Sequence, residues 1–420
     1  MSEFLDALHL HRNEIDSIEV LQQTLKQGGV RPEMVVNGVD VSEVEDWGES
    51  LQEVMFIGCV FRDIQQRHHI EHLGAYVFPR LSGLPYDPYR GTLYSVDELL
   101  EGYDAHGYAG SLDFGIYTHF DRARRHRYGL SIKEALAQRL HDRAIDDALA
   151  EVLHHHSGEG VVGVMGGHGV RRDAPEFRAV AQTTWRLARS GYFVASGGGP
   201  GIMEAANLGA WLSHYSDEAV IDAALDVLSQ APKFDGDQPE GSQAYLDAIG
   251  DYVGRAREVR ERFGLNASLQ TARTFSRERP DPGQSLAVPT WFYGHEPTNL
   301  FGNHVAKYFS NSLREDGLLA ISLGGVIYAP GSAGTYQEIF MDLAQNHYAT
   351  FTWRSAMVFL GSEHYASIFE WIQSFVQARG MEQVYGHMLG LCDTPQQAHD
   401  FVVSHPPIER AHHTPLYELL

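Results

Sequence analysis

Cysteine, positive charge and long apolar runs are all scarce in this sequence. Only two cysteines occur, Cys59 and Cys392, and they form no C-x-x-C pair, which argues against a disulfide framework or a cysteine-based zinc site. No apolar run approaches the ~20 residues that span a bilayer, and the first residues lack the basic and apolar segments of a secretory signal. We therefore expect a cytoplasmic protein with no membrane partner.

The shortage of positive charge excludes a further class of partner. Lysine and arginine total 32 against 55 aspartates and glutamates, which gives a formal net charge of −23. A surface this acidic repels nucleic acids, so no nucleic-acid partner is expected. An anionic small molecule would need a pocket that is locally positive.

Histidine is abundant, but its spacing does not predict a metal site. Among 23 histidines, His68 and His72 have the i, i+4 spacing of a helical ligand pair, and no H-E-x-x-H motif occurs. His154, His155 and His156 are adjacent, so one helix face cannot present all three. We expect neither a metal ion nor a cofactor.

The most informative segment is Tyr328–Glu338, YAPGSAGTYQE. It follows the apolar run Leu318–Tyr328 and precedes a helical pattern, which is typical of a strand, a glycine-rich turn and a helix. Backbone amides at such a turn, together with the positive end of the helix dipole, form a cradle for a phosphate. The predicted cradle residues are Gly331, Ser332, Gly334 and Thr335, with the carboxylate of Glu338 beside them.

A purely structural interpretation of this segment is also open. Thr335 and Glu338 have the T-x-x-E spacing of a capping box, which stabilises a helix start without any ligand. This segment alone does not distinguish a ligand site from a simple helix cap. The presence of further glycine turns in the chain would favour the ligand site.

Two such turns lie upstream, each after a strand-like run. Ser196–Ala210, SGGGPGIMEAANLGA, follows Tyr192–Ala195, and the turn Gly166–Gly169 follows Gly160–Met165. Each turn alone indicates only a tight connection between a strand and a helix. Three of them together favour a ligand crevice at the carboxyl ends of a parallel sheet. The upstream residues predicted to line this crevice are Gly166, Gly167, Gly198, Gly199, Gly201 and Met203.

A polar loop follows the predicted strand Ser285–Tyr293 and should reach the same sheet edge. His295, Glu296 and Asn299 are its candidates for contacting a base or a ribose. The alternative is a polar turn that is organised by the contacts of its own side chains.

The pair of motifs GGGPGIMEAAN and PGSAGTYQE resembles the LONELY GUY (LOG) family, whose signatures are GGG-x-x-G-x-M and PGG-x-GT-x-x-E. The resemblance covers roughly residues 158–210 and 284–400. It implies a Rossmann-like α/β domain, with a parallel sheet and helices on both faces. It also implies a phosphoribohydrolase that cleaves the N-glycosidic bond of a nucleoside 5′-monophosphate, giving free base and ribose 5-phosphate. A non-catalytic nucleotide sensor or carrier is the alternative.

The resemblance also implies roles for individual residues. Glu338 corresponds to the glutamate of PGG-x-GT-x-x-E and would stabilise positive charge on the ribose. The family's catalytic arginine corresponds most nearly to Arg314, offset by about one residue, and Lys307 is the competing cation. Ser332 replaces the second glycine of PGG. If that position requires a positive φ, the serine costs on the order of 1 kcal/mol.

The chain is long enough for two or three domains. We expect a helical N-terminal arm at 1–50 and an accessory α/β unit at 51–150. A LOG-like nucleotide-binding domain would follow at 151–400, with a helical insertion at 211–283 and a C-terminal tail at 401–420.

The resemblance further predicts a homodimer or a larger homo-oligomer, because active sites of the family lie beside a dimer contact. Sedimentation at micromolar protein should therefore show a species larger than one 46.9 kDa chain, since that concentration populates ordinary specific dimers. A monomer alone under these conditions would contradict the prediction.

Overall fold

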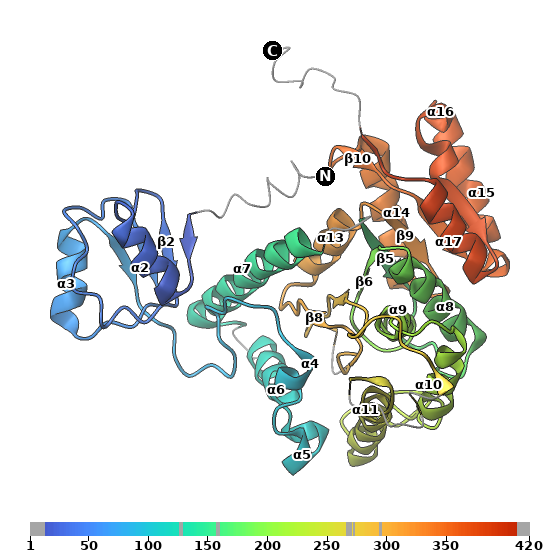
Figure 1. Cartoon of the computed structure of the whole chain (residues 1–420), viewed down its shortest axis with the longest axis horizontal. Coiled ribbons are helices and arrows are strands. Elements are labelled where there is room, and N and C mark those ends of the chain that lie inside the picture. Colours follow the sequence, from blue (N-terminus) through green and yellow to red (C-terminus); the bar gives the residue numbers. More distant parts are fainter. Residues whose placement is uncertain are drawn as a thin grey trace. The chain divides into compact units, whose positions relative to one another are not determined.

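The computed structural model describes residues 13–125, 129–156, 160–265, 271, 274–293 and 296–409. The chain divides into two compact units (Figure 1). The first comprises Met1–Leu93 and Ile116–His155, and the second comprises Tyr94–Gly115 and His156–Leu420. Within the described ranges, no helix is both long enough and apolar enough to cross a bilayer.

The first unit contains a four-stranded parallel sheet in the order β1-β2-β3-β4. Val35 pairs with Met55, and Met55 pairs with Tyr76, so equivalent positions recur after 20 and 21 residues. Each strand lies beside the next one in the chain, which is the arrangement of a solenoid. The strands are β1 (Glu14–Ile15), β2 (Val35–Asn37), β3 (Met55–Ile57) and β4 (Tyr76–Phe78), and the helices of the unit are α2 (Ile18–Lys26), α3 (Ile64–His72), α7 (Ile132–His155) and most of α6 (Leu112–Arg124).

The same backbone geometry recurs in successive turns of the solenoid. Glu33 and Glu53 have φ values of 68° and 64°, and Gly38 and Gly58 have 69° and 65°. The Tyr89 side chain lies against both glycines, so that a Cβ on either would come within 2.7 Å of it. Glycine therefore serves at these positions for its backbone freedom and for the space that it leaves.

This sheet differs from the predicted organisation of the first 150 residues. The boundary predicted at residue 50 lies between β2 and β3, so residues 13–50 form part of the sheet rather than a helical arm. Residues 94–115 group with the second unit instead of the predicted accessory unit.

The second unit is built on a seven-stranded sheet in the order β12-β11-β9-β5-β6-β7-β8, with all neighbouring strands parallel. Helices α8 and α9 pack against each other, as do α13 and α14. The predicted α/β class with a helix-flanked parallel sheet is confirmed. The strands are β5 (Val161–Met165), β6 (Phe193–Ser196), β7 (Ser285–Ala287), β8 (His304–Val305), β9 (Gly325–Tyr328), β11 (Met357–Leu360) and β12 (Leu389–Cys392).

Helices account for most of the remaining described residues of this unit. They are α4 (Val96–Leu99), α5 (Tyr103–His106), η1 (Tyr108–Gly110), α8 (Pro175–Arg189), α9 (Ile202–Leu212), α10 (Ala219–Leu228), α11 (Gln243–Phe263), α13 (Asn311–Ile321), α14 (Ala333–Tyr348), α15 (Ser362–Ala378), α16 (Glu382–Tyr385), η2 (Gly386–Met388) and α17 (Pro395–Ser404). A two-stranded antiparallel sheet pairs β10 (Trp353–Arg354) with β13 (Ile408–Glu409). Residues 401–409 are therefore structured, although the tail was predicted to begin at 401.

A buried ion pair fastens the insertion to the core. Arg172 donates from Nε to Glu204 Oε2 at 2.7 Å and from Nη1 to the carbonyl of Tyr252 at 3.0 Å. The Tyr252 hydroxyl donates to the same carboxylate. Glu204 is on α9 and Tyr252 is on α11, so this group joins the helix after the triple-glycine turn to the insertion. Removing either charged member, Arg172 or Glu204, would leave a buried charge unpaired, which is strongly destabilising.

The solenoid repeat makes a testable prediction about stability. Gly58→Ala should loosen strands β2 to β4, because it adds about 1 kcal/mol of backbone strain and about 1–3 kcal/mol of overpacking against Tyr89. Gly48→Ala is the matched control, since Gly48 also has a positive φ, 76°, but its added Cβ would meet nothing within 4 Å. Hydrogen exchange of the β2–β4 amides should be faster in the Gly58 variant. Equal exchange in the two variants would show that Tyr89 does not restrict this position.

Candidate functional site

The site lies where the order of strands reverses. From the central β5 the chain proceeds to β6, β7 and β8 on one side and returns to β9 on the other. Loops at the carboxyl ends of the strands diverge at such a point and leave a crevice. The Gly167 amide donates to the carbonyl of Pro330 at 3.1 Å, and the Ile202 amide donates to the carbonyl of Gly167 at 3.1 Å. The three predicted glycine turns thus meet at one sheet edge.

Close backbone approach explains the glycines of the upstream turns. Gly198 and Gly201 have φ values of 72° and 68°. A Cβ on Gly201 would lie 2.6 Å from the carbonyl oxygen of His168, and one on Gly198 would lie 2.6 Å from Cδ of Pro289. A Cβ on Gly166 would lie 2.8 Å from Cβ of Ile202. These glycines therefore shape the crevice by letting the loops pack on one another.

The turn after β9 leaves its backbone open. Helix α14 begins at Ala333, and its N-cap residue, Ser332, makes no side-chain capping bond. Ser332 and Gly334 are exposed, whereas Thr335 is buried. The first amides of a helix have no partner within the helix, so these amides are available to an anion.

The structure decides two points that the sequence of this turn left open. Thr335 is the third residue of α14 rather than its N-cap, so the T-x-x-E spacing does not form a capping box. Ser332 has φ −113° and ψ −155°, which is extended backbone, so the serine in place of glycine brings no positive-φ strain.

Glu338 and Arg314 form a partly shielded pair beside the turn. Nη1 of Arg314 lies 3.8 Å from Oε1 of Glu338 and 3.9 Å from Oε1 of Glu315. The Glu338 side chain is 12% exposed. Burial raises the pKa of Glu338 to about 7; Arg314 opposes this rise, and the negative charge of Glu315 adds to it. A carboxyl group with this pKa can exchange a proton near neutral pH.

Lys307, the competing cation, is engaged elsewhere. Its ammonium group is buried and donates to Oδ1 of Asp113 and to Oγ1 of Thr298, each at 2.7 Å. Asp113 also accepts a hydrogen bond from the indole of Trp291. Arg314, rather than Lys307, is therefore the cation that contacts Glu338.

Two residues of the predicted loop after β7 make different contacts at the site. The amide and the side chain of Asn299 donate to the carbonyls of Gly198 and Gly199, at 2.9 and 3.3 Å, so Asn299 holds the triple-glycine turn in place. Glu296 instead pairs with His168, with Nδ1 and Oε1 at 3.1 Å. His295 lies outside the described residues.

Two groups at the site escaped the sequence prediction. His168 stands inside the predicted turn Gly166–Gly169, and its place among the glycines was the available signal. Glu315 follows Arg314 and accepts hydrogen bonds from Gln337 and Tyr293, at 2.9 and 3.3 Å. Nothing in the local sequence distinguishes Glu315 from an ordinary helix carboxylate. Among the residues that the structure describes, no group of three histidine, cysteine or carboxylate side chains is arranged to hold a metal ion.

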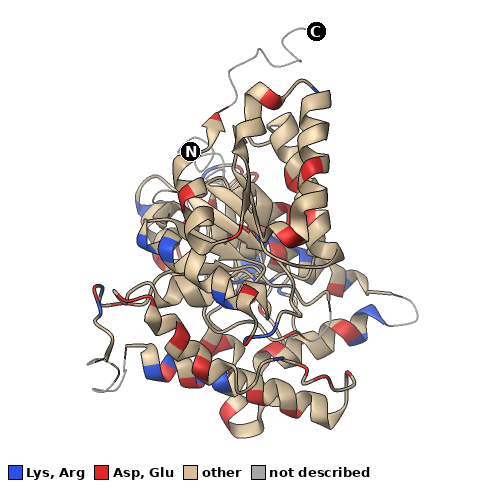
Figure 2. Ribbon diagram, turned by 90° about the vertical axis from the view of Figure 1, so that its right-hand side faces the viewer, with Lys and Arg blue, Asp and Glu red and all other residues tan. Residues whose placement is uncertain are grey.

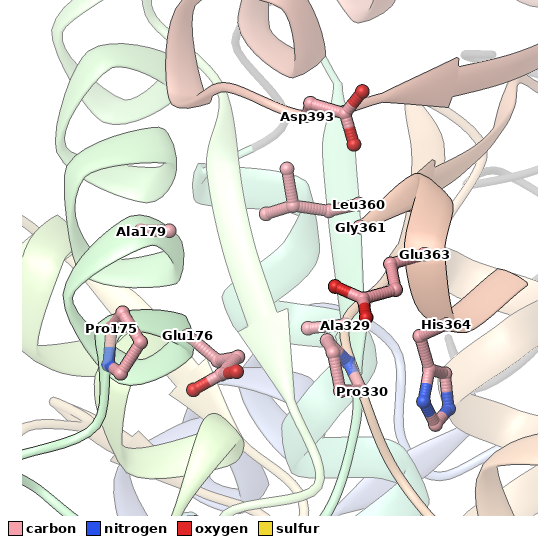
Figure 3. A pocket seen from close by; sticks show the side chains of 10 residues that line it. All are labelled: Pro175, Glu176, Ala179, Ala329, Pro330, Leu360, Gly361, Glu363, His364 and Asp393. Atoms are coloured by element: carbon pink, nitrogen blue, oxygen red, sulfur yellow. The ribbon is translucent and has the colours of Figure 1, made fainter.

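A cavity of about 490 Å³ has Pro330 in its lining (Figure 3). It lies at the ends of β9, β11 and β12 and at the start of α8, and three carboxylates and one histidine line it. Figure 2 shows that acidic residues, coloured red, are also spread over the helices. The cavity is lined by Pro175, Glu176, Ala179, Ala329, Pro330, Leu360, Gly361, Glu363, His364 and Asp393. This lining suits an anion less well than the open turn at Ser332.

No protein-family model matches the sequence, and no curated protein matches it. Among solved structures, the chain is similar to a molybdenum cofactor binding protein from Rippkaea orientalis, with 12% identity and a TM-score of 0.32. It is also similar to the molybdenum cofactor carrier protein of Chlamydomonas reinhardtii, with 13% identity and a TM-score of 0.30. Each similarity covers 58% of this chain and 96% of the other.

The open turn predicts that binding depends on a phosphate. By calorimetry, a nucleoside should bind at least about tenfold more weakly than its 5′-monophosphate, because one lost charge-assisted hydrogen bond is worth ~1.5–3 kcal/mol. Equal affinities of the two compounds would rule out the α14 amides as the anion site.

Proposed function

We propose that this chain hydrolyses the N-glycosidic bond of a nucleoside 5′-monophosphate and releases the free base and ribose 5-phosphate. The observation that carries the proposal is the shielded Glu338 carboxyl group, 3.8 Å from Arg314 and on the first turns of the helix whose amides are open. The resemblance of the two glycine motifs to the LONELY GUY family supports the same reaction. A homo-oligomer in the cytoplasm is part of this proposal.

In the proposed complex, the 5′-phosphate binds the backbone from Gly331 to Thr335. The backbone amides and the helix dipole supply the positive potential that the acidic surface lacks. The ribose then lies toward Glu338 and Arg314, because these side chains border the turn. Arg314 is held in place by its Nε, which donates to the carbonyl of Val288 at 3.0 Å. Its guanidinium remains available to neutralise a phosphate or ribose oxygen.

Cleavage of the bond between C1′ and the base leaves positive charge on the ribose. The electron pair of that bond departs with the base nitrogen, and a water molecule attacks C1′. The Glu338 carboxylate stabilises the developing charge and accepts the proton of the water, as carboxylates do in glycosidases. The anionic form of Glu338 is therefore the active form.

The charge state of Glu338 makes a prediction about pH. Because the carboxylate is active and its pKa is about 7, kcat/KM should rise as the pH increases through about 7. Glu338→Gln should still bind nucleotide, but its kcat should fall by ~10²–10³-fold, since one preorganised electrostatic contact is removed. Base release and nucleotide binding are measured separately, the first by chromatography and the second by calorimetry.

Glu315→Gln is the matched control for this prediction. It removes a neighbouring negative charge that raises the pKa of Glu338, so the rise in kcat/KM should move to lower pH while turnover persists. Near-wild-type turnover in the Glu338 variant would contradict its role. If the unaltered protein binds nucleotides but releases no base from any of them, the chain is a nucleotide sensor or carrier instead.

A further inference from the structure

The site holds a second pair of titratable groups, Glu296 and His168. Glu296 comes from the loop after β7 and His168 from the turn after β5, and they meet at 3.1 Å. Oε2 of Glu296 lies 3.2 Å from the position of a Cβ on Gly199. Glu296 is therefore in contact with the triple-glycine turn, at the same sheet edge as the open turn of α14. Neither phosphate binding nor the activation of water uses this pair.

Contacts in series connect Glu296 to Arg314 and Glu338. Met203 reaches along the glycine turn: its Cε lies 2.8 Å from the Cβ position of Gly199, and its Sδ lies 2.6 Å from that of Gly197. A guanidinium nitrogen of Arg314 also lies against Gly197. The electrostatic influence of Arg314 acts on both Glu338 and Glu296. The two carboxyl groups thus belong to one site, with Arg314 and Met203 between them.

The His168 side chain is both oriented and open to solvent. Its ring contacts the ring of Phe234 edge-on, with centroids 6.4 Å apart, while Nδ1 faces Glu296. The His168 side chain is 57% exposed, whereas that of Glu296 is 25% exposed. A proton given up by the carboxyl group can therefore be replaced from water through the imidazole.

We propose that the Glu296–His168 pair is the proton donor for the departing base. This inference rests on the proposed function. In the step, Glu296 transfers its proton to a ring nitrogen of the base while the C1′–N electron pair leaves with the base. Glu338 receives a proton from the attacking water, and exchange with solvent through His168 returns a proton to Glu296. The balance is nucleotide plus water to base plus ribose 5-phosphate.

General-acid catalysis of this kind contributes typically ~10²–10⁴-fold to a rate. Desolvation raises the pKa of Glu296, while the charges of His168, Arg314 and Lys307 oppose the rise. Burial thus favours the protonated carboxyl group that the step requires.

The test compares two leaving groups in the full-length protein. One substrate is the nucleoside 5′-monophosphate that the protein cleaves, and the other is 4-nitrophenyl riboside 5′-phosphate, whose nitrophenolate departs without being protonated. Glu296→Gln should lower kcat for the nucleotide by ~10²–10³-fold and leave the nitrophenyl substrate within about threefold of the unaltered protein. Glu338→Gln should slow both substrates, because both require water activation.

Matched controls separate the possible outcomes. Glutamine keeps a hydrogen-bonding partner for His168, and calorimetry should show unchanged nucleotide binding by Glu296→Gln. Glu363→Gln, in the neighbouring cavity, should leave both rates unchanged. Equal slowing of both substrates by Glu296→Gln would overturn the proton-donor role while leaving the proposed function intact. If the unaltered protein cleaves neither substrate, the proposed function fails and this inference fails with it.

Discussion

Backbone packed directly on backbone sets the geometry of the sheet edge. A Cβ on Gly201 would lie 2.6 Å from the carbonyl oxygen of His168, and a Cβ on Gly198 would lie 2.9 Å from the backbone nitrogen of Pro289. At these positions the backbone of one loop lies directly against the next, so the loops after β5, β6 and β7 form one continuous wall. Three side chains lie against this wall, those of Arg314, Met203 and Glu296. The packing of the loops fixes their positions. The open turn of α14 lies beside the same wall, since Gly167 bonds to Pro330.

Two buried cations near this wall have different environments. Lys307 is neutralised by Asp113 and bonded to Thr298, so its charge stabilises the packing of the segment 94–115 on the loop after β7. Among the described residues, the carboxylates that Arg314 contacts lie at 3.8 and 3.9 Å, and its Nε donates to a backbone carbonyl. In a protein with a net charge of −23, this difference makes Arg314 the better candidate of the two for attracting an anion.

The insertion helps to build the site in addition to covering part of the core. Tyr252 of α11 is bonded into the Arg172–Glu204 pair, and Glu204 lies on α9 just after the triple-glycine turn. Phe234, between α10 and α11, contacts the ring of His168. A substitution in the insertion could therefore shift the glycine turn through its contacts with Glu204. It could also shift the proton-donating pair through the contact of Phe234 with His168.

Local sequence determined much of this protein. Glycine turns after apolar runs predicted a parallel sheet with a crevice at its carboxyl edge, because a strand followed by glycines and a helix needs few long-range contacts to be recognised. The same local pattern also predicted that Glu338 lies beside the cradle residues, because all of them fall within one turn and the start of one helix. A 20-residue recurrence from Glu33–Val39 to Glu53–Cys59 is also present in the sequence. Apart from the glutamate and the glycine, only the backbone geometry and the buried positions repeat, so the residue types alone do not indicate it.

Tertiary structure alone decided which polar groups are free and which are paired. From the sequence, Arg314 is the nearest match to the family's arginine and Lys307 is its competitor. Only the tertiary structure shows that Lys307 is engaged by Asp113, from 194 residues away. The pairing of His168 with Glu296, and the assignment of Asn299 to holding the glycine turn, likewise join residues about a hundred positions apart or more. The charge and the pKa of a side chain depend on the groups that burial brings within a few ångströms, and those neighbours are set by the fold rather than by the local sequence.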